Sequence, residues 1–161
     1  MDMNNAVTDI KGLVELLKRY NGFGECIILD VRLRHYQTIL EVVIDYIWDE
    51  TGSKVRANAG EVAEMILFRF GRVQEIHFGN ALNASMLAEP EQLNWGMNEI
   101  AAMRLIDDPN VLNSYRNLPV IFHQVEIRWE NERRIQVVFA DVNVTRIPNT
   151  PTATSNGETV L

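Results

Sequence analysis

Residues 119–147 read PVIFHQVEIRWENERRIQVVFADVNVTRI, and this stretch decides the fold. In its first part apolar side chains recur at odd positions (Ile121, Val125, Ile127 and Trp129), and polar side chains fall between them (Gln124, Glu126 and Arg128). A period of two is typical of a strand with one buried face. The second part, Ile135 to Val144, is rich in β-branched residues and apolar on both faces. With polar residues 130–133 as its turn, the stretch predicts a long antiparallel hairpin whose second strand is central in a sheet.

The rest of the chain contains further strand patterns and one helix pattern. Strands are expected over residues 26–36, 39–49, 62–70, 73–78 and 98–106, with a tight turn near residues 36–38 and polar or irregular connections over 49–60 and 79–96. Residues 6–20 place Val7, Ile10, Val14 and Leu17 at helical spacing, with Lys18 and Arg19 in the last turn. The predicted fold is therefore α+β, with a mainly antiparallel sheet of six to seven strands and an N-terminal amphipathic helix. This helix covers the sheet, or alternatively docks on a partner.

Length and composition indicate one globular domain. The chain has 161 residues, of which 47% are hydrophobic and 23% charged, as in an ordinary globular protein. We assign residues 1–147 to this domain. Residues 148–161, PNTPTATSNGETVL, hold almost no core-forming side chain and are expected to be a disordered tail.

The formal net charge is −7, which disfavours nucleic acid and anionic membranes as partners and favours a basic protein. The alternative is that the charge only keeps the chain in solution. The single cysteine, Cys26, excludes an intrachain disulfide and is expected to be a buried structural thiol. Neither a signal peptide nor a membrane-spanning run is apparent, so a cytoplasmic location is expected.

The sequence contains no recognisable catalytic motif. His35, His77 and His123 each stand apart from other metal-ligand residue types, and no serine lies in a nucleophile-elbow pattern. Asp107-Asp108 resembles a carboxylate pair, but Pro109-Asn110 follows it, and this order favours a turn. We therefore expect a non-enzymatic protein with no cofactor, no metal and no catalytic residues.

Negative charge is concentrated between Ala81 and Ser114, where five acidic residues accompany one arginine. Trp95 lies in the same irregular segment. The alternative is that part of this segment, residues 85–93, forms a helix. Acids around a tryptophan on loops have the composition of a recognition surface for a basic protein. The expected partner-binding residues are Glu89, Glu91, Trp95, Glu99, Asp107 and Asp108. The alternative is that Trp95 caps the core and the acids are solvated.

Two strand phrases resemble a known family. Residues 67–76 read LFRFGRVQEI, and residues 139–144 in the closing hairpin read FADVNV. Together with the early hairpin, over roughly residues 23–147, the chain resembles small bacterial immunity proteins of polymorphic and contact-dependent toxin systems. The resemblance implies a non-enzymatic protein that binds and neutralises one cognate toxin.

Two other functions remain open at the level of sequence. One is a self-associating structural or adaptor domain, such as a homodimer, that uses an apolar face or an exposed edge strand. The other is an enzyme whose site is assembled from dispersed histidines and acids.

Overall fold

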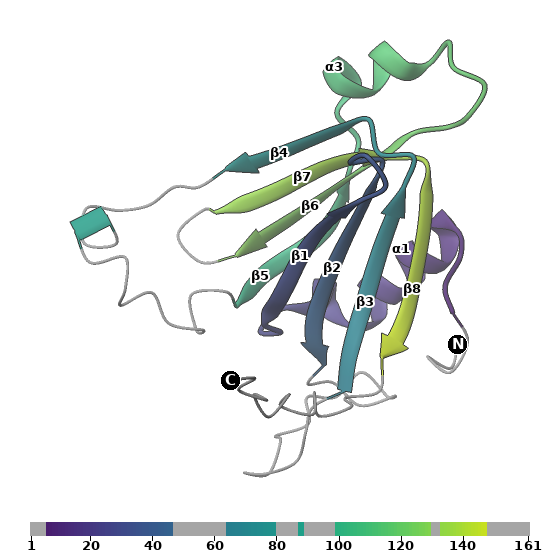
Figure 1. The fold of residues 1–161 in the computed structure, drawn as a ribbon. Helices are drawn as coiled ribbons and strands as arrows, with labels where there is room; N and C mark the ends of the chain where they lie inside the picture. Colours follow the sequence, from purple (N-terminus) through teal and green to yellow (C-terminus); the bar gives the residue numbers. More distant parts are fainter. Residues whose placement is uncertain (1–5, 47–63, 80–86, 89–98, 130–132, 148–161) are drawn as a thin grey trace, which may run out of the picture.

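The computed structural model describes residues 6–46, 64–79, 87–88, 99–129 and 133–147. Eight antiparallel strands are present in this part of the chain, and they form two four-stranded sheets (Figure 1). The first sheet has the order β1-β2-β3-β8, formed by β1 (Ile28–Arg34), β2 (Ile39–Tyr46), β3 (Glu64–Gly71) and β8 (Asp141–Ile147). The second has the order β4-β7-β6-β5, formed by β4 (Glu75–Gly79), β7 (Arg134–Phe139), β6 (His123–Trp129) and β5 (Ile100–Ile106). The predicted α+β class is confirmed.

The long strand expected after the 130–133 turn passes from one sheet to the other. It divides at Ala140 into β7 and β8, and its neighbour divides at residues 72–74 into β3 and β4. Pairing continues around this corner, because Ala140 N–H donates to Gly71 O at 3.1 Å and Gln74 N–H donates to Val138 O at 2.9 Å. Arg72 also forms an ion pair with Asp141. The two sheets therefore share two continuous stretches of chain, which diverge from the corner in Figure 1.

The sheets also meet at a second corner, where β1 approaches β5. Ile27 forms an isolated antiparallel bridge with Glu99. Beside it Glu25 N–H donates to Ile100 O at 2.8 Å, and Ile100 N–H donates to Cys26 O at 2.7 Å. Two sides of the sandwich are left: one between edge strands β8 and β5, and one between edge strands β1 and β4.

Helix α1 (Ile10–Arg19) fills the β5–β8 side. It packs against both β8 and β5, and it lies behind β3 and β8 in Figure 1. Asp9 caps it by accepting a hydrogen bond from Gly12 N–H at 2.7 Å, while Leu13, Leu16 and Leu17 are buried. A single 3₁₀ turn, η1 (Asn21–Phe23), then brings the chain onto β5. At Gly22, with φ +62°, a Cβ would lie 2.7 Å from Met103 O, so this close approach requires glycine.

The helix is shorter than residues 6–20. Val7 bridges Val144 in the manner of a strand, so the helix begins only after the Asp9 cap. The expected apolar stripe is wrong at Val14, which is 47% exposed. Leu17, which the stripe includes, is buried, as are Leu13, Leu16 and Tyr20.

Aromatic rings connect the helix to both sheets. Phe23 contacts Tyr20 at a centroid distance of 5.4 Å and Phe68 at 5.2 Å. Phe70, 6.4 Å from Phe68, lies 4.9 Å from Phe139 of the second sheet. These rings belong to one buried cluster, so both sheets and the helix share a single core.

A second covering segment lies on the outer face of the second sheet. After β5, α3 (Pro109–Leu112) and η4 (Asn113–Tyr115) form a short helical excursion, capped by Asp108. Tyr115 packs on buried Phe122 at 5.2 Å and donates a hydrogen bond to Glu75 on β4. Glu75 therefore connects β4 to a segment that reaches it from the far edge of the sheet.

The strict alternation expected over residues 121–129 is wrong at two places. Ile121 is 78% exposed because β6 begins only at His123. Gln124 and Glu126, expected on the wet face, are both 4% exposed. The outer face is therefore covered at Gln124 and Glu126, whereas the sequence pattern predicts water at both positions.

Candidate functional site

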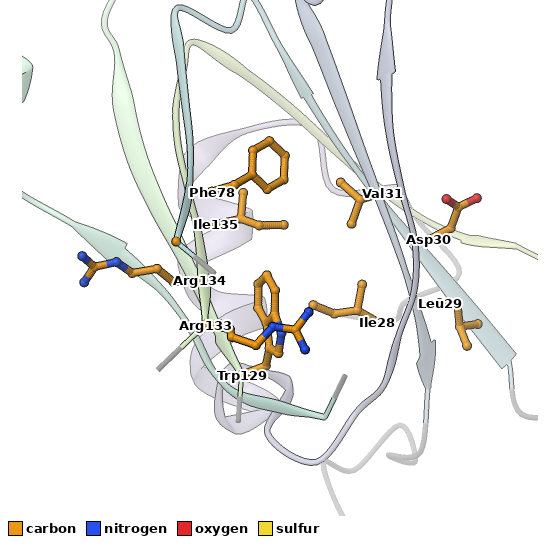
Figure 2. Close-up of a pocket in the computed structure, with 10 residues that line it drawn as sticks. Ile28, Leu29, Asp30, Val31, Phe78, Trp129, Arg133, Arg134 and Ile135 are labelled. Carbon is orange, nitrogen blue, oxygen red and sulfur yellow. The ribbon is translucent and has the colours of Figure 1, made fainter. Parts of the chain in front are cut away.

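The β1–β4 side, which α1 does not cover, contains a cleft of about 400 Å³ (Figure 2). Its lining comes from β1, from the end of β4, and from the ends of β6 and β7 where they approach their turn. The lining residues are Ile28, Leu29, Asp30, Val31, Phe78, Gly79, Trp129, Arg133, Arg134 and Ile135. The cleft therefore lies between the two sheets, at an open side of the core.

One wall of the cleft is strand β1. Ile28 and Val31 point into the cleft, while Leu29 and Asp30 point away from it (Figure 2). The register of β1 on β2 shifts between Ile28 and Asp30. Because of this shift the side chains of Ile28 and Val31, three positions apart, point to the same side. This irregularity leaves an apolar wall on the cleft side.

A buried contact fixes the start of this wall. Ile27 N–H donates to a carboxylate oxygen of Asp45 at 2.7 Å, and Asp45 N–H donates to Ile27 O at 3.0 Å. Burial raises the pKa of Asp45, and the hydrogen bond from Ile27 partly opposes this shift. Asp45 on β2 therefore holds the start of β1 in place against β2.

The opposite wall is aromatic and aliphatic. Phe78 is 57% exposed, although its side chain points toward the cleft (Figure 2). It pairs in register with Ile135, which is buried. Trp129 is also buried, and its Nε1–H has no hydrogen-bond partner in the described part of the chain. This N–H is itself buried, so it is closed to a ligand in the cleft.

Arg133 supplies positive charge to the cleft. Its guanidinium carbon lies 5.3 Å from the centre of the Trp129 ring, and in Figure 2 the side chain extends across toward Ile28. Burial lowers the pKa of Arg133, which still carries its charge at neutral pH. Apolar walls beside the Arg133 guanidinium suit an apolar group that carries an oxygen acceptor next to it.

Of the residues predicted for partner binding, the structure describes Glu99, Asp107 and Asp108, and it does not bring these three together. Glu89, Glu91 and Trp95 lie outside the described residues. Glu99 lies at the start of β5, beside Ile27, whereas Asp107 and Asp108 follow its far end. Along an extended strand eight residues span roughly 27 Å. The structure therefore separates Glu99 from the aspartate pair.

Asp108 has a structural role that explains the turn predicted at this point. Its carboxylate accepts a hydrogen bond from Asn110 N–H at 2.9 Å and caps α3, with Pro109 in the first turn of that helix. The carboxylate pair thus begins a helical turn.

The three histidines lie on separate elements. His35 is in the turn after β1, with φ +52°, and His77 on β4 lies 3.0 Å from Glu75. His123 begins β6, its ring 6.0 Å from that of Phe139, and burial lowers its pKa. Within the described ranges, no three histidine, cysteine or acidic side chains are grouped closely enough to hold a metal ion.

The cleft was not anticipated from the sequence. Ile28, Phe78, Trp129 and Ile135 are ordinary strand residues in the sequence, and their convergence depends on which edges of the two sheets face each other. Phe78 ended an expected strand and gave no other signal. Only the structure brings these distant residues together.

No protein-family model, curated protein or solved structure matches the chain. Of the helices in the described ranges, none has the length and apolar character needed to span a membrane. The fold and site define an antiparallel two-sheet α+β protein with a helix filling one side of its core and a cleft at the other.

Proposed function

We propose that this chain is a binding protein, of the immunity type, that neutralises a cognate protein toxin without catalysing a reaction. The β1–β4 cleft is the observation that favours binding, since Phe78 is 57% exposed and shares the cleft with the cation of Arg133. Exposed aromatic anchors beside a polar group are typical of protein-recognition sites. The choice of a toxin as the partner rests on the resemblance of residues 67–76 and 139–144 to immunity proteins.

In this proposal the cleft takes an apolar side chain of the toxin. Phe78 and Ile135 contact that side chain, and Arg133 binds an oxygen acceptor beside it. Bound protein then covers the toxin's active site or substrate groove, and neutralisation follows from occlusion.

The acidic segment would add long-range attraction to a basic toxin. Glu89, Glu91, Trp95 and Glu99 remain the proposed contributors to one such surface. Asp107 and Asp108, at the other end of β5, would touch a separate part of the partner. Reversing the charges of Glu89 and Glu91 should slow association about tenfold or more at low salt, and an unchanged on-rate would remove this electrostatic contribution.

The decisive experiment is co-expression of the full chain with the C-terminal module of a toxin encoded by the neighbouring gene. The expected result is restored growth, with a stable complex on size exclusion. Growth arrest despite good expression of both proteins, or a neighbouring gene that encodes no toxin, would contradict the proposal.

Two matched variants assign the effect to the cleft. Phe78→Ala should weaken protection and complex formation, because it removes the exposed anchor. Ile121→Ala removes another exposed apolar side chain outside the cleft, 78% exposed, and should leave both unchanged. Equal loss in the two variants would argue against the cleft.

A homodimer is the second candidate function. Edge strand β1 exposes Leu29 and Leu33, and edges of this kind pair readily with a second chain. A dimer that persists on dilution in a sizing measurement favours this role, whereas a monomer favours the toxin-binding role.

A further inference from the structure

The outer face of the second sheet carries two arginines directly opposite each other. Arg128 on β6 and Arg134 on β7 are cross-strand partners, and both are exposed. Ala102 pairs with Arg128 on one side, and Gly79 pairs with Arg134 on the other. The four residues form one row across the sheet in which only the arginines have long side chains.

The carboxylates of this face have other partners. In the next row Arg104 donates to Glu126 at 3.1 and 2.9 Å, and Gln136 donates to the second oxygen of Glu126 at 3.0 Å. Beyond it Glu75 accepts from Tyr115 and His77, which lower its pKa in that order. Among the described residues, neither Arg128 nor Arg134 has a hydrogen-bond or ion-pair partner.

The first sheet shows the ordinary arrangement on its outer face. Arg32 forms an ion pair with Asp30, and Arg34 lies 3.2 Å from Glu41. In a chain with a net charge of −7, acids are available to neutralise arginines. Like charges directly opposite each other destabilise a sheet, so the Arg128–Arg134 pair lowers stability in the free protein.

The backbone around Arg134 gives its side chain room over the sheet edge. A Cβ on Gly79 would lie 3.0 Å from Cγ of Arg134, so the arginine stem lies directly over the glycine. Figure 2 shows Arg134 pointing away from the cleft, whereas Arg133 points into it. The guanidinium of Arg134 therefore points outward, although Arg134 and Gly79 also belong to the lining at the rim of the cleft.

We propose that Arg128 and Arg134 bind a carboxylate-rich segment of a protein partner. Each guanidinium presents paired donors that match a carboxylate, and neutralisation of both charges removes their mutual repulsion. The net charge of −7 disfavours a long anionic polymer such as nucleic acid and favours a short carboxylate segment on a partner that is otherwise neutral or basic. This surface goes beyond the toxin-binding role proposed for the cleft.

The test measures binding of a fluorescein-labelled hexaglutamate peptide to the full chain by fluorescence anisotropy at low salt. The double variant Arg128→Gln/Arg134→Gln should weaken binding about tenfold. Arg69→Gln is the matched control, because Arg69 is exposed on the outer face of the first sheet, and it should bind as the unchanged protein does. Thermal unfolding of each variant verifies that it is folded, and the double variant should melt no lower than the unchanged protein.

Two competitors test the class of partner. Oligothymidylate and phosphatidylserine vesicles should both bind more weakly than hexaglutamate, and tighter binding of either would overturn the choice of a protein carboxylate partner. Equal peptide affinity of the double variant and the Arg69→Gln control would overturn the site itself. Phe78→Ala should leave peptide binding unchanged, so failure of the arginine surface is distinguishable from failure of the cleft.

Discussion

The two sides of the sandwich that the strands leave open have different contents. On the β5–β8 side α1 inserts Leu13, which is fully buried. On the β1–β4 side the walls remain apart, and Phe78 stays 57% exposed. The same kind of opening is thus closed by a helix in one place and kept as a cleft in the other.

This difference separates stability from recognition. Apolar area removed from water stabilises the folded state by about 25 cal/mol per Å², so the filled side contributes to folding. Apolar area left accessible at the cleft contributes little to folding and is available to a partner. Substitutions on the two sides should therefore have opposite consequences for unfolding and for binding.

The largest expected effect separates the two sides directly. Leu13→Ala should lower the free energy of unfolding by about 3 kcal/mol, since it deletes fully buried methyl groups and leaves a cavity. Phe78→Ala should lower it by less than about 1 kcal/mol, because the ring already meets water. Urea unfolding monitored by tryptophan fluorescence measures both, and similar losses would contradict the distinction.

A smaller effect is expected where the filled side meets β5. Gly22→Ala should cost about 2 kcal/mol, because the new Cβ would clash with Met103 O at a left-handed φ of +62°. Gly24→Ala is the control, with ordinary contacts of 3.6 Å or more and a φ of −52°. If Gly24→Ala proved as costly as Gly22→Ala, the close approach to β5 would not be the cause.

The smallest effect concerns the β1 wall of the cleft. Asp45→Ala should cost about 1 kcal/mol by removing the acceptor of buried Ile27 N–H, and Asp45→Asn should cost less because it keeps an acceptor. Chemical unfolding at neutral pH compares the two variants. Equal costs would mean that the hydrogen bond does not hold the wall.

The same carboxyl gives a dependence on pH with a defined sign. Burial raises the pKa of Asp45 in the folded state above the unfolded value of about 3.9, so between the two values the folded state binds more protons. The contribution of Asp45 to stability is therefore greatest below the unfolded pKa and falls as the pH rises through the folded pKa. Asp45→Asn should remove this fall, and a difference from the unchanged protein that stays constant with pH would contradict the assignment.

Much of the fold can be predicted from local sequence patterns. The alternation of apolar residues predicts β1, β2, β3 and β6, and the β-branched run from Ile135 predicts β7. The separate strands expected over residues 62–70 and 73–78 agree with the division between β3 and β4. The division at Ala140 was not predictable, because neither glycine nor proline marks it. The chain bends there only because two sheets share it.

The site can be predicted from the sequence much less well than the fold. The alternating pattern predicts that Glu126 faces solvent. The pattern contains no information that Arg104 on β5 pairs with Glu126 on β6 and binds its carboxylate. Val7 continues the helical spacing, yet pairing with distant Val144 prevails over that local preference. The cleft likewise depends on edge strands β1 and β4 facing each other. These strands are far apart in sequence, so local sequence patterns do not predict the cleft.

The corner at Gly71 and Ala140 has a consequence for how the molecule is made. Since β3 pairs with β8, and Val7 with Val144, the first sheet cannot be completed during synthesis until residues 141–147 have left the ribosome. Pairings this distant in sequence are formed slowly, because the loops between them must close first. Until then the apolar faces of β2 and β3 stay uncovered, and the nascent chain is most exposed to aggregation or chaperone capture in that interval.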